Sequence, residues 1–134
     1  GEHVIGEEVE ASMLKAAEEE NVHITEFTVA PFVSSDEGKS YHEWFVEFEN
    51  TPHNLSVFAA RLDQHLRQKN VYYDDLIGGN ILSPLKLTPV RKNGFIDYMK
   101  SIGKLGGQNK VPRLSNDRKI ANELEKWSVN LQTV

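Results

Sequence analysis

The segment from Tyr41 to Phe48 constrains the fold more than any other part of this sequence. Its residues alternate between two faces of an extended strand, with His42, Trp44, Val46 and Phe48 on one face and Tyr41, Glu43, Phe45 and Glu47 on the other. The segment from His23 to Val33 is also rich in Thr, Val, Ile and Phe. A polar cluster at residues 34–39 separates the two segments. Two strand-like segments joined by a short polar turn predict an antiparallel hairpin.

Amphipathic helices are predicted on both sides of this hairpin. The first runs from Glu7 to Glu20, with its apolar residues on one stripe and glutamates over the rest. The second begins with Thr51 as N-cap and Pro52 at the first helical position, where a missing N–H costs nothing. Its apolar residues follow at helical spacing: Leu55, Phe58, Ala59, Leu62 and Leu66. This stripe predicts that the second helix packs on the core.

Weaker signals complete the order of elements. A short strand is expected at His3 to Ile5, and another at Leu85 to Val90, where prolines indicate an exposed edge or a bulge. A short helix ends at Gly103, and Ser115 is expected to cap a final helix over about residues 116–131. This order is the split β-α-β arrangement of a ferredoxin-like α+β sandwich. The sandwich has one antiparallel or mixed sheet with helices packed on it.

Composition narrows the function classes. A chain of 134 residues has room for one domain with a single modest core. The absence of cysteine excludes disulfides, thiolate zinc sites and a cysteine nucleophile, and the five histidines lack metal-site spacing, so no metal site is predicted. The net charge of −5 argues against binding to nucleic acid or to an anionic membrane. The longest apolar stretch is too short to span a bilayer and no signal peptide is present, which is compatible with a cytoplasmic location.

The charges are unevenly distributed along the chain. Acids gather in residues 1–20 and cations in residues 100–119, so the second region is either a solvated face or a candidate site for a discrete anion. Within it, the glycine-rich loop 103–113 combines three glycines with two lysines and an arginine. Glycines allow close backbone approach to a ligand and exposed N–H groups, so these are the ingredients of a phosphate cradle. A flexible surface loop has the same composition, and the loop is not a Walker A motif because no Ser or Thr follows a Gly-Lys pair.

Two runs carry a resemblance to a known family. The runs YHEWFVEF (residues 41–48) and GKLGGQNKVPRLSNDR (residues 103–118) resemble the C-terminal domain of the auxin-responsive (Gretchen Hagen) acyl-acid amido synthetase family, and most closely its bacterial branch. The resemblance covers nearly the whole chain. It implies that residues 1–134 form a single cap domain of a larger adenylate-forming ligase, and that this domain alone is not a complete enzyme.

The resemblance also implies a reaction. Members of the adenylate-forming superfamily use ATP and Mg²⁺ to convert a carboxylic acid to an acyl-adenylate, and then pass the acyl group to an amine, commonly an amino acid. A large N-terminal domain holds ATP and the acid, and the small C-terminal domain closes over it. That N-terminal domain is therefore the expected partner, and no cofactor is expected on the C-terminal domain alone. The residues by themselves leave an alternative open, which is a free-standing ferredoxin-like module that binds a small anion or has a regulatory role.

One lysine carries the implied chemistry. The phosphate-contacting lysine of the family corresponds to Lys110, in the run QNKVPR. Plant members of the family usually have Tyr where this chain has Asn109, and they lack its pair of glycines. Lysine is a compact cation that can meet the charge developing on departing pyrophosphate. The residues expected to form the phosphate site are Gly106, Gly107, Gln108, Asn109, Lys110 and Arg113.

Overall fold

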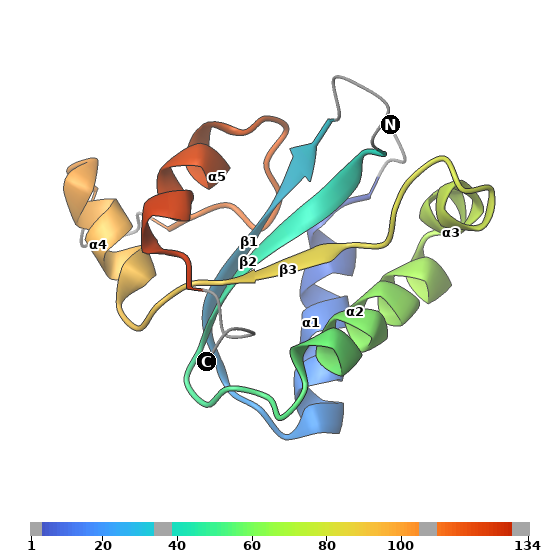
Figure 1. The fold of residues 1–134 in the computed structure, drawn as a ribbon, viewed down its shortest axis with the longest axis horizontal. Helices are drawn as coiled ribbons and strands as arrows, with labels where there is room; N and C mark the ends of the chain where they lie inside the picture. Colours follow the sequence, from blue (N-terminus) through green and yellow to red (C-terminus); the bar gives the residue numbers. More distant parts are fainter. Residues whose placement is uncertain (1–3, 34–38, 105–109, 130–134) are drawn as a thin grey trace.

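The computed structural model describes residues 4–33, 39–104 and 110–129, and within them a three-stranded sheet lies between two layers of helices (Figure 1). The elements in chain order are α1 (Gly6–Glu20), β1 (Ile24–Phe32), β2 (Tyr41–Phe48), α2 (Leu55–Lys69), α3 (Val71–Gly78), β3 (Lys86–Pro89), α4 (Gly94–Ser101), α5 (Lys119–Leu124) and a 3₁₀ helix (Glu125–Trp127). The mixed α+β class expected from the sequence is confirmed.

The sheet has the order β1-β2-β3. Strands β1 and β2 form the predicted antiparallel hairpin, in a register that pairs Phe32 with Tyr41 and Val29 with Trp44. Strand β3 is parallel to β2, so the chain must cross over between them, and α2 and α3 make this crossover. Strand β3 lies at an edge of the sheet, as its prolines predict.

The two layers of helices follow from the alternation in β2. Helices α1, α2 and α3 cover one face of the sheet, and α4 and α5 cover the other (Figure 1). Trp44 and Val46 pack in the core on the first side, and Phe45 packs in the core on the second. Strand β2 is therefore buried on both faces. The two faces predicted from the alternation of its residues are confirmed.

The α4–α5 layer is small and closes against the 3₁₀ helix. The ring of Tyr98 meets that of Trp127 edge-on, with 6.1 Å between the ring centroids. Burial raises the pKa of the Tyr98 phenol above its ordinary value, and the negative charge of Glu123 raises it further. The phenol is thus protonated at neutral pH and acts as a packing group in this layer.

The helix boundaries in the middle of the chain differ from those expected. Helix α2 begins at Leu55, not at Pro52, because the side chain of Asn54 accepts a hydrogen bond from the Val57 N–H at 3.1 Å and so acts as the N-cap. Asn70 then ends α2 in an extended conformation, and its side chain accepts from the Tyr73 N–H at 2.8 Å. This second cap starts α3, for which the sequence predicts no element.

Both ends of the chain also differ from expectation. Ile5 is extended but serves as the N-cap of α1 and not as part of a strand, whereas His3 lies outside the described residues. The final helix is shorter than the expected 116–131, because α5 begins at Lys119 and ends at Leu124, and residues 130–131 of the expected range lie outside the described residues. Ser115 does not cap it, because Arg118 stands at the N-cap position. The Ser115 N–H donates to the Val29 carbonyl at 2.8 Å, which ties this residue to β1 instead.

Three buried carboxylates connect the helices to the sheet. Asp63 on α2 accepts from the Tyr73 hydroxyl at 2.5 Å and from the Leu85 N–H at 3.3 Å. Glu47 on β2 accepts from two N–H groups at the start of α4, and Glu43 on β2 accepts from the Thr88 hydroxyl. Each carboxylate thus has hydrogen-bond donors that offset the cost of its burial.

Among the helices of the described ranges, none combines the length and apolar character required to cross a bilayer.

We predict that Asp63→Ala lowers the free energy of unfolding by about 3–4 kcal/mol, because it leaves a hydroxyl and an N–H buried without their acceptor. The matched control is Asp74→Ala, which removes an acid from the neighbouring, partly exposed pair with Arg67 and should cost less than about 1 kcal/mol. Urea unfolding of both variants measures the difference. Equal losses would contradict the assignment of Asp63 as the link between α2, α3 and the start of β3.

Candidate functional site

The structure describes two of the six residues expected at the phosphate site, Lys110 and Arg113. The other four, Gly106 to Asn109, lie outside the described residues. Lys110 is exposed, and the next residue, Val111, is buried in the core beneath α4 and α5. Lys110 therefore stands where the glycine-rich loop rejoins the folded domain.

The segment that follows Lys110 is attached to the outer edge of β1. The Thr28 hydroxyl donates to the Pro112 carbonyl at 2.5 Å. The Val29 N–H donates to the Arg113 carbonyl at 2.9 Å, and the Val29 carbonyl accepts from the Ser115 N–H at 2.8 Å. These bonds form a short parallel bridge on the side of β1 away from β2. The end of the loop is thus held by backbone hydrogen bonds to the sheet.

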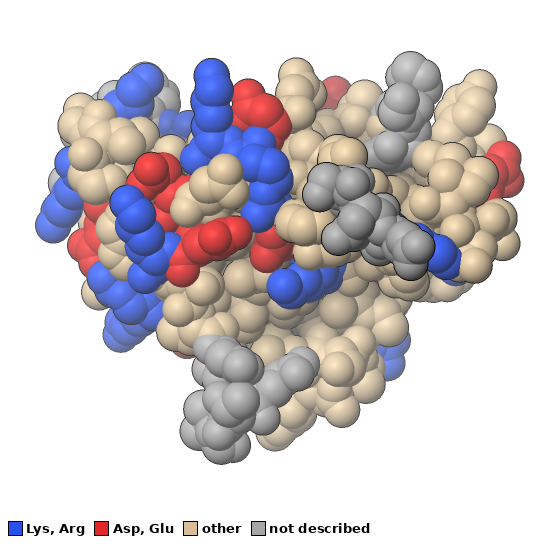
Figure 2. Space-filling model, turned by 45° about the horizontal axis from the view of Figure 1, so that its top comes forward, with Lys and Arg blue, Asp and Glu red and all other residues tan. Residues whose placement is uncertain are grey.

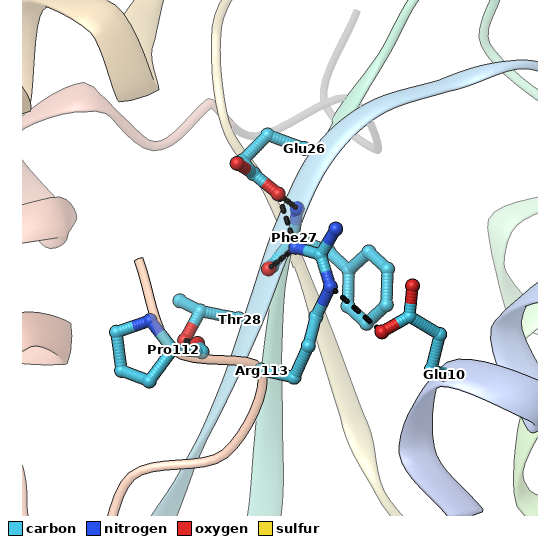
Figure 3. Close-up of polar contacts among 6 residues, drawn as sticks. All are labelled: Glu10, Glu26, Phe27, Thr28, Pro112 and Arg113. Atoms are coloured by element: carbon cyan, nitrogen blue, oxygen red, sulfur yellow. Dashed lines mark hydrogen bonds and ion pairs between the residues drawn. The ribbon is translucent and has the colours of Figure 1, made fainter. Parts of the chain in front are cut away.

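The side chain of Arg113 adds a second attachment (Figure 3). Its guanidinium donates to the Phe27 carbonyl at 2.8 Å, forms an ion pair with Glu26, and lies 3.4 Å from a carboxylate oxygen of Glu10 on α1. It also lies over the Phe27 ring, 4.2 Å from the ring centroid. In this arrangement Arg113 joins α1, β1 and the end of the loop. The phosphate contact expected of Arg113 stays a prediction, and it would require the guanidinium to exchange some of these partners.

A pocket of about 270 Å³ lies beside this cluster, between α1 and the first half of β1. Apolar side chains form most of its lining, and Glu10, Glu26 and Arg113 contribute the charged part. The sequence does not predict this pocket, because it depends on how closely α1 approaches the edge of the sheet.

Arg118 is a structural residue that the sequence shows only as one cation of a basic region. Its guanidinium lies 2.8 Å from a carboxylate oxygen of Glu43, whose side chain is only 6% exposed, and 3.1 Å from Glu125. It also lies near the rings of Phe32 and Phe45. One feature of the sequence could have indicated this ion pair. Glu43 lies on the strand face that also carries Phe45, and an acid buried on that face requires a partner.

The cations of residues 100–119 therefore fall into two groups, those in ion pairs with acids and those exposed to solvent. Arg113 and Arg118 pair with acids, and the exposed cations of this region are Lys100, Lys104, Lys110 and Lys119. Figure 2 shows basic and acidic side chains interspersed over the part of the surface formed by α4 and α5. Among the described residues, this face carries no continuous basic surface of the kind that binds a polyanion. Individual lysines beside the glycine-rich loop remain suited to a small phosphate group.

The described residues bring together no cluster of three or more His, Cys, Asp or Glu side chains that could hold a metal ion. Of the charged side chains at the site, Lys104 and Lys110 flank residues 105–109 on either side, and both are exposed. The exposed ammonium group of Lys110 suits phosphate oxygens, which lysine binds as a point charge.

Comparison with known protein families gives one match. The sequence model of the GH3 family C-terminal domain matches residues 7–119. No curated protein matches the sequence. The fold is similar to the solved structure of GH3.15 acyl acid amido synthetase, with a TM-score of 0.67 and 18% identity over 92% of this chain and 22% of that one. It is also similar to AtGH3.15 acyl acid amido synthetase in complex with 2,4-DB, with a TM-score of 0.68 and 15% identity over 92% of this chain and 24% of that one.

At these identities the structural matches show a shared fold, and this chain spans only about a quarter of the length of either protein. The family match covers most of the chain and agrees with the resemblance of residues 41–48 and 103–118. The bacterial branch stays a prediction. The chain therefore belongs to the GH3 family, as its C-terminal domain.

Proposed function

We propose that this domain is the C-terminal cap of an ATP-dependent acyl-acid amido synthetase. It closes over an N-terminal domain of the same polypeptide and supplies Lys110 to the phosphates of ATP during acyl-adenylate formation, before amide ligation to an amino acid. The family match supports this role, as do the two similar structures, both of which are acyl acid amido synthetases. The observation that carries the proposal is the exposed Lys110 at the point where the glycine-rich loop meets a firmly attached segment.

Lys110 would act on the leaving group of the first step. The acid carboxylate attacks the α-phosphorus of ATP, the bond to pyrophosphate breaks, and negative charge grows on the departing oxygen. An ammonium group placed against that oxygen lowers the barrier, because it stabilises charge that is larger in the transition state than in bound ATP. Mg²⁺ bound with ATP would neutralise the remaining phosphate charge.

The loop before Lys110 would supply the other phosphate contacts. Gly106 and Gly107 allow the backbone to approach a phosphate, and Gln108 and Asn109 offer amide N–H donors. Lys110 then follows as the cation that the anchored segment holds. We also propose a cytoplasmic enzyme of the bacterial branch, because the reaction consumes ATP and because residues 103–118 resemble that branch.

We predict that residues 1–134 alone show no exchange of pyrophosphate into ATP with any carboxylic acid. The proposed pockets for the acid and the adenine belong to the N-terminal domain, and holding both reactants together supplies much of the catalysis. The intact enzyme, assayed under the same conditions, is the positive control. Exchange by the isolated domain would show that it carries its own acid and nucleotide sites and would contradict its role as a cap.

The second prediction concerns Lys110 in the intact enzyme. Lys110→Ala should slow pyrophosphate exchange roughly 10²- to 10³-fold at saturating ATP and acid, because a cation is lost where charge develops. The KM for the acid should change little, since the ammonium group acts on the phosphates and not on the acid.

Two other exposed lysines serve as matched controls for this variant. Lys104→Ala and Lys119→Ala should each slow exchange by about tenfold or less, because these side chains affect only the local field. Arg118 is unsuitable as a control, since its removal would leave the buried Glu43 without its ion-pair partner. If Lys104→Ala and Lys110→Ala proved equally mild, Lys110 would not be the phosphate lysine.

A further inference from the structure

We propose that Arg113 is a positioning residue for Lys110. Its guanidinium, held by Glu26, Glu10 and Phe27, fixes the end of the loop from which Lys110 extends, and so fixes where the ammonium group stands when the domain closes. This inference rests on the role proposed above for Lys110, and it assigns a function to contacts that this role does not itself require.

The contacts of Arg113 lie next to the backbone hydrogen bonds that join residues 113–115 to the outer edge of β1. The backbone groups of Val29 that face away from β2 bond to residues 113–115. Two residues earlier in the strand, Phe27 presents its N–H and carbonyl on the same side. Glu26 accepts from that N–H at 3.0 Å, and Arg113 donates to that carbonyl at 2.8 Å. Side chains thus extend the attachment of the loop along β1 by two residues.

This attachment lies close to Lys110 in the sequence and leaves it little freedom. Arg113 is three positions after Lys110, so their Cα atoms lie at most roughly 11 Å apart. The two residues between them are restricted: Val111 is buried, and Pro112 fixes its own φ and disfavours helical geometry at Val111. A shift of the Arg113 side chain would therefore reach Lys110 through a short, stiff connection.

The chemistry of the cluster favours arginine and a positioning role. A planar guanidinium can contact two carboxylates, a carbonyl and an aromatic face together, whereas a lysine ammonium group cannot. Glu10 and Glu26 also neutralise Arg113, so in this arrangement its charge does not compete with Lys110 for a phosphate. The cluster holds the loop without providing a second exposed cation at the same place.

Positioning and charge make opposite predictions for Glu26. If the cluster acted through its electric field on an anion, Arg113→Ala would slow adenylation and Glu26→Ala would leave it unchanged or speed it. If the cluster acts by holding the loop, both substitutions slow it. A misplacement of about 1 Å can cost up to about 10²-fold in rate, so a loss of roughly tenfold for each variant is expected.

The kinetic test uses pyrophosphate exchange by the intact enzyme at saturating ATP and acid. Arg113→Ala and Glu26→Ala should each be about tenfold slower, and in the Lys110→Ala background each should change the rate less than about twofold, because they act through Lys110. The matched control is Arg67→Ala, which removes an arginine of equal exposure, 32%, from its pair with Asp74 and should change the rate less than about twofold.

Hydrogen exchange of the intact enzyme provides a readout that does not depend on activity. The Val29 and Ser115 amides, which join β1 to the anchored segment, should lose protection in Arg113→Ala and Glu26→Ala. They should keep it in Lys110→Ala and in the control variant.

Three results would overturn the positioning role. One is unchanged protection of these amides in Arg113→Ala and Glu26→Ala. Another is full tenfold losses that persist in the Lys110→Ala background. The third is a Glu26→Ala enzyme as fast as wild type beside a slow Arg113→Ala enzyme, which would mean that Arg113 acts directly on the phosphates. A Lys110→Ala enzyme with an unchanged rate of pyrophosphate exchange would instead refute the proposed function. This variant therefore distinguishes failure of the proposed function from failure of the positioning role.

Discussion

The burial of β2 on both faces is the constraint on which the rest of the structure depends. This strand is covered on one side by α1, α2 and α3 and on the other by α4 and α5. Every residue from His42 to Glu47 is buried, and two of them are the acids Glu43 and Glu47. Each must find donors from the covering layer. Arg118 reaches Glu43, and backbone N–H groups at the start of α4 reach Glu47. The second helical layer is thus attached to the sheet by polar contacts as well as by its small apolar core.

The same layer determines where the basic loop is held. The chain leaves α4, passes through the glycine-rich residues, and returns at Lys110 to run beside β1 before forming α5. Because β1 is an outer strand of the sheet, its edge is available to accept this segment. Arg113 and Arg118 attach the segment at two points, and Lys110 precedes both. The arrangement separates the anchoring arginines from an exposed lysine, which agrees with the role proposed for Lys110.

Local patterns in the sequence predicted much of this fold, and non-local contacts explain the rest. Alternation in Tyr41 to Phe48 identified β2 and both of its faces, and helical spacing identified α1 and α2. The start of α2 was misplaced because Thr51 and Asn54 are both cap residues, and only the folded chain shows which side chain reaches an N–H. The start of α5 was misplaced because Ser115 pairs with β1, far away in the sequence. At the site, Lys110 was chosen from the sequence, and the structure describes it as exposed. The partners of Arg113 come from α1 and β1, which are distant in the sequence, so no local pattern predicted them.

We propose that Lys110 meets the phosphates of ATP when the domain closes in the intact enzyme. The most direct measurement is labelling with an ATP derivative that carries an acyl group on its terminal phosphate, followed by mass spectrometry of the lysines. A lysine amine beside the phosphates attacks the acyl carbonyl, the bond between the acyl carbon and the phosphate oxygen breaks to release ATP, and the acyl group stays on the lysine as a stable amide. We expect the label on Lys110, with excess ATP preventing it and Lys104 labelled much less. A label confined to other lysines, with Lys110 unmodified, would contradict the claim.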